Sequence, residues 1–160
     1  ASGADCLVIC TNTMHKVAAQ IVKEIDIPLI HIADATAEKL LENNVTKVGL
    51  LGTAFTMEQD FYKGRLSETY AIDVVTPNKE QRQQVHNIIY NELCRGVISD
   101  SSRRIYLEII DSLVREGAQG VILGCTEISL LIKPEHTQAH LYDTTEIHAL
   151  KAVEFALRNH

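Results

Sequence analysis

Short apolar runs alternate along this chain with longer stretches of helical periodicity. Cys6–Cys10 and Gly120–Gly124 are apolar or glycine throughout, whereas Val85–Leu93 carries its apolar residues at helical spacing. Runs without a polar face are typical of strands buried on both sides, as in parallel sheets. Neighbouring parallel strands need a long crossover, usually a helix. The alternation therefore predicts an α/β fold in which helices flank parallel sheets.

Turn and capping residues delimit the expected elements. Pro28 ends an early helix, and Asn78 with Gln81 three residues later has the spacing of a capping box. Glycines at 96 and 117 end the two helices that follow. We expect strands at 6–10, 29–32, 47–51, 72–75, 120–124 and 140–142, and helices at about 17–25, 33–43, 57–70, 79–95, 100–116, 126–132 and 144–157.

The length of the chain, 160 residues, allows one ordinary domain or two small lobes. The segment from 44 to 142 is long enough to form a complete lobe. The first 43 residues lie near the roughly 40-residue floor for an independent core. We therefore expect a partial first lobe made of residues 1–43 with about 143–160, and a second lobe made of residues 44–142.

Composition excludes several classes of function. The net charge is −6, from 15 basic and 21 acidic residues without a basic block, so nucleic acid is not an expected partner. The apolar runs are far shorter than the ~20 residues of a membrane span, so no membrane partner is expected. Without a secretion signal at Ala1, the four cysteines are expected to be free thiols of a cytoplasmic protein. Their spacing fits no zinc site, and no metal is expected.

Small polar residues follow three of the predicted strands. The three strand ends carry Thr11–Thr13, then Thr53 with Thr56, and finally Cys125–Glu127. In parallel sheets, ligands bind beyond the carboxyl ends of strands, where loops meet helix starts. Hydroxyl, amide and backbone N–H groups at such a place suit a carboxylate or a phosphate. No glycine-rich nucleotide fingerprint is present, so no nucleotide cofactor is expected.

Cys125 is the most reactive side chain of these strand ends. A thiol at a helix N-terminus has its thiolate stabilised by the helix dipole, so we expect a pKa below ~8.5. Such a thiol can act as a base or a nucleophile. The alternative is a buried structural cysteine beside Thr126, with Thr126 as the helix cap.

Three motifs together resemble the aspartate/glutamate racemase family, whose members use no pyridoxal phosphate. They are Val8–His15, Leu50–Thr53 and Gly124–Glu127, and they stand in the family's order at the ends of successive α/β units. The likeness is greatest to the broad-specificity aspartate/glutamate branch and extends over essentially the whole chain. It implies two similar lobes with a substrate cleft between them.

The resemblance implies cofactor-independent racemisation of aspartate or glutamate by two acid/base residues on opposite faces of the α-carbon. The matching catalytic positions are Thr11 and Cys125. One group removes the α-proton and the other returns a proton from the far side, while hydrogen bonds stabilise the developing carbanion. The matching substrate-binding residues are Asn12, Thr13 and Thr126, with Thr56 and Thr53 as weaker candidates. Glu127 either tunes Cys125 or is a first-turn glutamate that faces solvent, and His15 is expected to pack behind the motif.

The chain departs from the family pattern in two places. Thr11 stands where most members have cysteine, which suggests a proton relay with unequal rates in the two directions. Cys10 is the alternative acid/base, although strand alternation predicts that it points into the core. Cys94 stands where aspartate racemases commonly have a lysine for the substrate's side-chain carboxylate, and the neighbouring Arg95 is the candidate substitute.

These departures leave alternatives open. Related enzymes of the superfamily racemise hydantoins, isomerise maleate or decarboxylate arylmalonates, and an inactive carboxylate-binding module is a further alternative. The resemblance also implies a homodimer. Since the family begins with a further strand, glycine-rich turn and helix, we expect this chain to be an N-terminally truncated or cleaved racemase of low activity.

Overall fold

The computed structural model describes residues 3–158 and contains two parallel sheets. In the first sheet, β1 (Leu7–Val8) pairs with β2 (Leu29–Ile30). The second has the order β4-β3-β5-β6. Its strands are β3 (Lys47–Gly52), β4 (Asp73–Val75), β5 (Val121–Gly124) and β6 (Leu141–Asp143). All pairings are parallel, which confirms the predicted α/β class.

Helices connect the strands, and α5 begins at its expected cap. The predicted capping box forms: the Asn78 side chain accepts from Gln81 N at 3.0 Å, and the Gln81 side chain accepts from Asn78 N at 3.2 Å. The α-helices are α1 (Ala18–Val22), α2 (Ile32–Glu42), α3 (Ala54–Glu58), α4 (Asp60–Gly64), α5 (Lys79–Asn91), α6 (Asp100–Arg115), α7 (Ile128–Leu131) and α8 (Thr144–Arg158). Shorter 3-10 turns are η1 (Thr13–Val17), η3 (Leu93–Arg95) and η4 (Pro134–His136), and η2 (Arg65–Thr69) is a π-helical turn.

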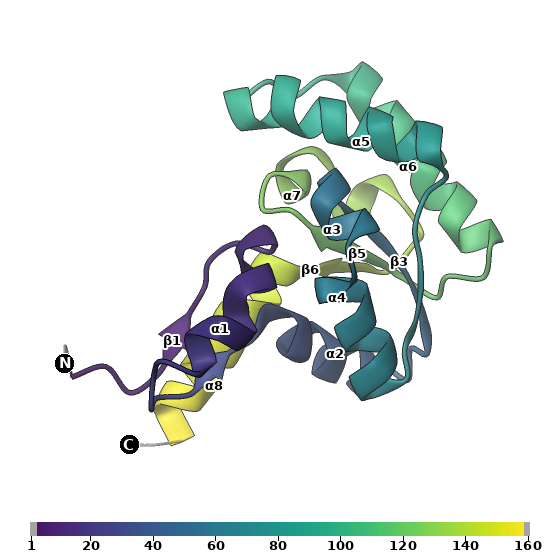
Figure 1. Ribbon diagram of the computed structural model, residues 1–160. Helices are drawn as coiled ribbons and strands as arrows, with labels where there is room; N and C mark the ends of the chain where they lie inside the picture. The colour runs from purple at the N-terminus through teal and green to yellow at the C-terminus, as the bar shows by residue number, and fades with distance from the viewer. Residues whose placement is uncertain (1–2, 159–160) are drawn as a thin grey trace.

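The second sheet has a core on each face. On one face α5, α6 and α7 cover residues such as Leu51 and Leu123. On the other, α2, α4 and η2 cover Val48, Leu50 and Ile122. Figure 1 shows α5 and α6 on one side of this sheet and α2 and α4 on the other. Strands buried on both faces account for the continuous apolar runs in the sequence.

The first sheet is smaller, and it shares its helices with the second. Helix α8 packs against α2 and β2, while α2 also buries Ile32, Ala37 and Leu40 in the core of the second sheet. Both described chain ends lie on the side where β1, α1 and α8 come together (Figure 1). Helix α2 therefore joins the two sheets.

Several expected elements are shorter than the sequence pattern predicts, among them the strand at 29–32, which is the two-residue β2, and the helix at 17–25, whose α-helical part is α1. The strand at 6–10 is reduced to β1, whose two residues are only half-buried. The helix at 57–70 is interrupted because Gln59 has an extended backbone (ψ 153°), which separates α3 from α4. The helix at 126–132 is the four-residue α7. Within residues 3–158, no helix combines the length and apolarity needed to cross a membrane.

Candidate active site

A cavity of about 300 Å³ lies where the polar strand ends meet. The loop after β1, the end of β3 and the loop after β5 each contribute to its wall, so the two sheets meet around one space. The motif residues that line it are Thr11, Asn12, Thr13, Thr53, Gly124, Cys125, Thr126 and Glu127. The remaining wall consists of Met14, Phe55, Ile89, Tyr90 and Cys94.

Asn12 ties the loop after β1 to the second sheet. Its Nδ2 donates to Thr144 Oγ1 at 3.0 Å, and this hydroxyl donates to the carbonyl of Leu123 in β5 at 2.9 Å. Leu123 lies two residues before Cys125, so the chain of hydrogen bonds fixes the two candidate catalytic segments relative to each other. Asn12 Oδ1 is buried and has no hydrogen-bond partner among the described residues. It is therefore available to accept a hydrogen bond from a ligand.

Cys125 keeps its proton in this arrangement. Its Sγ donates to Glu127 Oε2 at 2.9 Å, and burial, followed by that bond to the carboxylate, raises the pKa of the thiol to about 12. The expectation of a lowered pKa is therefore wrong. The physical reason is that α7 has only four residues and begins three residues after Cys125, too short and too distant to stabilise a thiolate.

Glu127 is partly exposed, and its carboxylate is hydrogen-bonded to the motif. Its Oε2 also accepts from Thr126 Oγ1 at 2.8 Å, so one oxygen receives both a thiol and a hydroxyl. Burial alone would raise the pKa of Glu127, but the bonds from Cys125 and Thr126 lower it below its usual value. Glu127 is therefore a carboxylate at neutral pH, in contact with the Cys125 proton.

Thr53, and not Thr56, reaches the cavity from the end of β3. Thr56 is fully buried, and its Oγ1 lies 3.3 Å from Thr53 Oγ1. A Cβ atom at Gly52 or Gly124, which pair across β3 and β5, would approach the Thr56 side chain to 3.1–3.4 Å. Thr56 therefore packs beneath the strand ends and does not line this cavity.

Thr11, and not Cys10, lines the cavity with Cys125, and Thr11 is exposed. Both residues line a smaller cavity of about 150 Å³, with Val8 and His148. Cys10 is exposed, so the expectation that it points into the core is wrong. The two-residue β1 leaves Cys10 beyond the strand, where strand alternation no longer applies.

Among the lining residues, none is a lysine or an arginine. Cys94 lies in the wall, and burial, followed by the charge of Glu127, raises the pKa of its thiol. Arg95 is exposed and does not line the cavity. The part of the chain that the structure describes also holds no group of three or more residues arranged to bind a metal ion.

The sequence of residues 1–152 matches the model of the Asp/Glu/hydantoin racemase family. This match covers most of the chain, and the chain therefore belongs to that family.

Two solved structures are similar over nearly the whole chain. A putative Asp/Glu racemase from Yersinia pestis superposes with a TM-score of 0.94 at 50% identity, covering 98% of this chain and 68% of that one. An aspartate racemase homologue from Pyrococcus horikoshii gives a TM-score of 0.88 at 38% identity, covering 97% and 68%. A glutamate racemase from Sulfurihydrogenibium is 28% identical over 130 residues, which are 79% of this chain and 48% of that protein. The chain thus spans between about half and two thirds of these relatives.

Sequence reasoning missed Thr144 and the apolar wall of the cavity. Thr144 belongs to none of the three motifs, and no local pattern links it to Asn12, 132 residues away. Met14, Phe55, Ile89 and Tyr90 lie in helical stretches whose apolar residues are equally typical of core positions. Phe55, Tyr90 and Met14 are each nearly half exposed, which only the structure reveals.

Proposed function

We propose that this chain carries the catalytic groups of a cofactor-independent racemase that inverts aspartate or glutamate by two-base proton transfer at the α-carbon. The observation that carries the proposal is that Thr11 and Cys125, which follow strands of different sheets, line one cavity. Two acid/base groups on opposite walls are what inversion requires, because one must remove a proton while the other returns one from the far face.

Cys125 and Glu127 form the stronger of the two acid/base groups. When Cys125 acts as the base, it takes the α-proton while its own thiol proton passes to the Glu127 carboxylate, 2.9 Å away. In the opposite direction the thiol delivers its proton to the carbanion, and the protonated Glu127 carboxyl group returns a proton to the sulfur. This arrangement needs no free thiolate in the resting enzyme.

Thr11 is the weaker group. A threonine hydroxyl is a poor acid and base near neutral pH, and Thr11 is exposed. Its role is to relay a proton between the substrate and water. We therefore expect unequal rates for the two enantiomers, with the slower exchange on the Thr11 face.

The remaining lining groups suit the backbone of an amino acid. The buried Asn12 Oδ1 accepts a hydrogen bond from the substrate ammonium. The hydroxyls of Thr13 and Thr53 donate to its carboxylate, where negative charge grows as the α-proton leaves, whereas the hydroxyl of Thr126, which also lines the cavity, donates to Glu127. Aspartate and glutamate are proposed as substrates because of the family and the names of the relatives. In this chain, polar groups and not a lysine or arginine of the wall would meet the side-chain carboxylate.

The test is α-proton exchange in deuterated water with D- and L-aspartate and D- and L-glutamate, combined with chiral analysis of the product. Cys125→Ala is expected to abolish exchange of one enantiomer and Thr11→Ala to slow the other. Full exchange of both enantiomers by Cys125→Ala would overturn the proposal. Binding of these amino acids without exchange by the wild-type chain would instead favour a carboxylate-binding module.

A further inference from the structure

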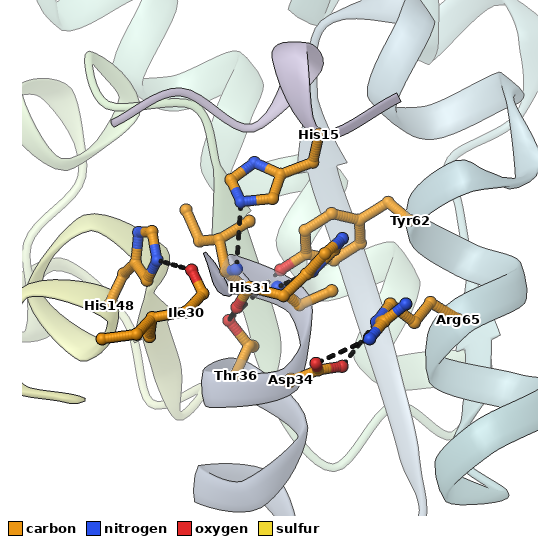
Figure 2. Close-up of polar contacts among 10 residues, drawn as sticks. His15, Ile30, His31, Asp34, Thr36, Tyr62, Arg65 and His148 are labelled. Carbon is orange, nitrogen blue, oxygen red and sulfur yellow. Dashed lines mark hydrogen bonds and ion pairs between the residues drawn. The ribbon is translucent and has the colours of Figure 1, made fainter. Parts of the chain in front are cut away.

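Three buried histidines lie behind the loop that carries Thr11. His15, His31 and His148 have exposed fractions of 3%, 7% and 3%. The His15 ring lies 4.5 Å from the centre of His31 and 5.7 Å from that of His148. Figure 2 shows His15 above the start of α2, with His148 to one side. None of the three lines the cavity that holds Cys125.

The hydrogen bonds of His15 determine where its proton lies. The backbone N–H of Ile32 donates to Nε2 at 3.2 Å, so Nε2 must be the unprotonated nitrogen. The proton is then on Nδ1, which donates to the carbonyl of Thr11 at 2.8 Å. Only the neutral ring with its proton on Nδ1 makes both bonds, and the ring thereby links the Thr11 peptide to the first residue of α2.

His15 also holds the next peptide of the loop. Its backbone N–H donates to the carbonyl of Asn12 at 3.1 Å. One residue therefore fixes the carbonyls of both Thr11 and Asn12. Thr11 is a candidate catalytic residue, and Asn12 presents the unpaired Oδ1.

The start of α2, to which His15 is bonded, is itself firmly held. His31 caps the helix, since its Nδ1 accepts from Ala33 N at 3.2 Å. His148 Nε2 lies 2.6 Å from the carbonyl of Ile30 and thus fixes β2 to α8. Asp34 in the first turn pairs with Arg65 of η2 through bonds of 2.5 and 2.7 Å, as Figure 2 shows. The loop that carries Thr11 is therefore bonded, through His15, to a part of the structure that is itself held in place.

We propose that His15 is a positioning residue that places the hydroxyl of Thr11 and the amide of Asn12 against the substrate through this anchor to α2. The inference rests on the proposed racemase function. Proton transfer is sensitive to position, and a shift of about 1 Å can cost up to about 100-fold in rate. The rate of proton transfer at the substrate face next to Thr11 should therefore depend on His15 more than the rate at the face next to Cys125.

A first experiment tests the geometry without any assay of activity. The ¹⁵N chemical shifts of the His15 ring in the wild-type chain report which nitrogen is protonated. We expect a protonated Nδ1 and an unprotonated Nε2 at pH 7, with slow hydrogen exchange at the Ile32 amide. A ring protonated at Nε2 would overturn the inference. This measurement does not depend on activity. A wild-type chain without α-proton exchange would count against the proposed function, but not against the hydrogen bonds of His15.

A second experiment separates positioning from simple packing. His15→Asn keeps an N–H donor at the place of Nδ1, His15→Gln puts its amide at the place of Nε2, and His15→Ala removes both. For the enantiomer that Thr11→Ala slows, we expect α-proton exchange to fall at least 10-fold in His15→Ala and His15→Gln. We expect His15→Asn to stay within about threefold of the wild type. Exchange of the other enantiomer should change less than threefold in all three variants.

His136→Ala is the matched control, because His136 Nδ1 also accepts from a backbone N–H, that of Lys133, but lies outside the cavity. It should leave both exchange rates unchanged. An equal loss for both enantiomers, or a His15→Asn variant no better than His15→Ala among chains with native circular dichroism, would show that His15 has only a structural role.

Discussion

At the scale of single residues, the contact between Cys125 and Glu127 decides how the thiol can react. Burial disfavours the thiolate most, and the carboxylate that accepts the thiol proton adds to this effect. The proposed enzyme therefore works with a protonated thiol next to a base, and not with a free thiolate that waits for substrate.

Glu127→Gln separates the effect of this contact on the pKa of Cys125 from its effect on the rate of racemisation. Without the carboxylate, the pKa of Cys125 should fall, because the charge that disfavours the thiolate is gone. The pH profile of Cys125 alkylation, followed on its own peptide by mass spectrometry, should move to lower pH. Racemisation should nevertheless fall at least 10-fold, since the proton acceptor is lost. An unchanged alkylation profile would contradict the assigned contact.

Thr144 is a second residue whose contacts predict a clear effect. Thr144→Val leaves the Asn12 amide and the Leu123 carbonyl without their partner, which should cost about 1–3 kcal/mol of stability. The free energy of unfolding in urea measures this loss. Thr145→Val changes an exposed neighbour on the same helix and should cost less than about 0.5 kcal/mol. Equal effects of the two variants would show that the bond to Asn12 contributes little.

At the scale of elements, two paired glycines allow the ends of β3 and β5 to come together under the cavity. A Cβ atom at Gly124 would stand 2.8 Å from the Leu51 carbonyl and 3.2 Å from Leu50 Cδ1. Neither the backbone oxygen nor the buried leucine can move without displacing a strand. The ends of the two strands can therefore lie this close together only because both carry glycine.

Gly124→Ala should lower the melting temperature by several degrees and displace Cys125, the next residue, so that exchange at the Cys125 face falls at least 10-fold. Gly64→Ala is the control, because its Cβ would meet nothing nearer than 3.5 Å within α4. It should leave the melting temperature unchanged or raise it slightly, since alanine favours a helix. A Gly124→Ala variant with wild-type stability and exchange would contradict the strand spacing described here.

The elements that the sequence predicted best are those with strong local signals. Helix α5 begins at its Asn78 capping box, and β3 and β5 follow the apolar runs closely, because cap chemistry and burial on both faces are encoded locally. The interruption at Gln59 and the short β1 depend on tertiary packing and carry no such signal. For the site, the motif residues at the strand ends were predictable. The bond from Asn12 to Thr144 and the packing of Thr56 against Gly124 join residues far apart in the sequence. The raised pKa of Cys125 depends first on burial, which is set by the folded chain.

At the scale of the whole molecule, the buried histidines make stability depend on pH. Burial lowers the pKa of His15 and brings that of His31 to about 4, with further lowering of both by Arg65. For Asp34, burial alone would raise the pKa, but its bond to Arg65 lowers it, so this ion pair persists above pH 4. His148 is the remaining titratable group in contact with His15.

The unfolded chain takes up these protons near pH 6.5, and the folded chain takes them up only at lower pH. The free energy of unfolding is therefore at its full value above about pH 6.5 and falls as the pH drops towards 4. The expected slope is about 1.4 kcal/mol per pH unit for each histidine that titrates. Urea unfolding at pH 7.5, 6 and 5 measures this slope of the free energy of unfolding against pH. His31→Ala should flatten the slope, whereas the exposed His140→Ala should not. A stability independent of pH in this range would contradict the neutral cluster.

The central claim is that two groups of this chain exchange protons with opposite faces of one α-carbon. The most direct measurement is the deuterium content of the product formed from each enantiomer of aspartate and glutamate in deuterated water, resolved by chiral chromatography and mass spectrometry. In a two-base mechanism, every inverted molecule of at least one of these amino acids is expected to carry one solvent deuteron at the α-carbon. Inverted product that retains its original proton, or the absence of both inversion and exchange with all four amino acids, would contradict it.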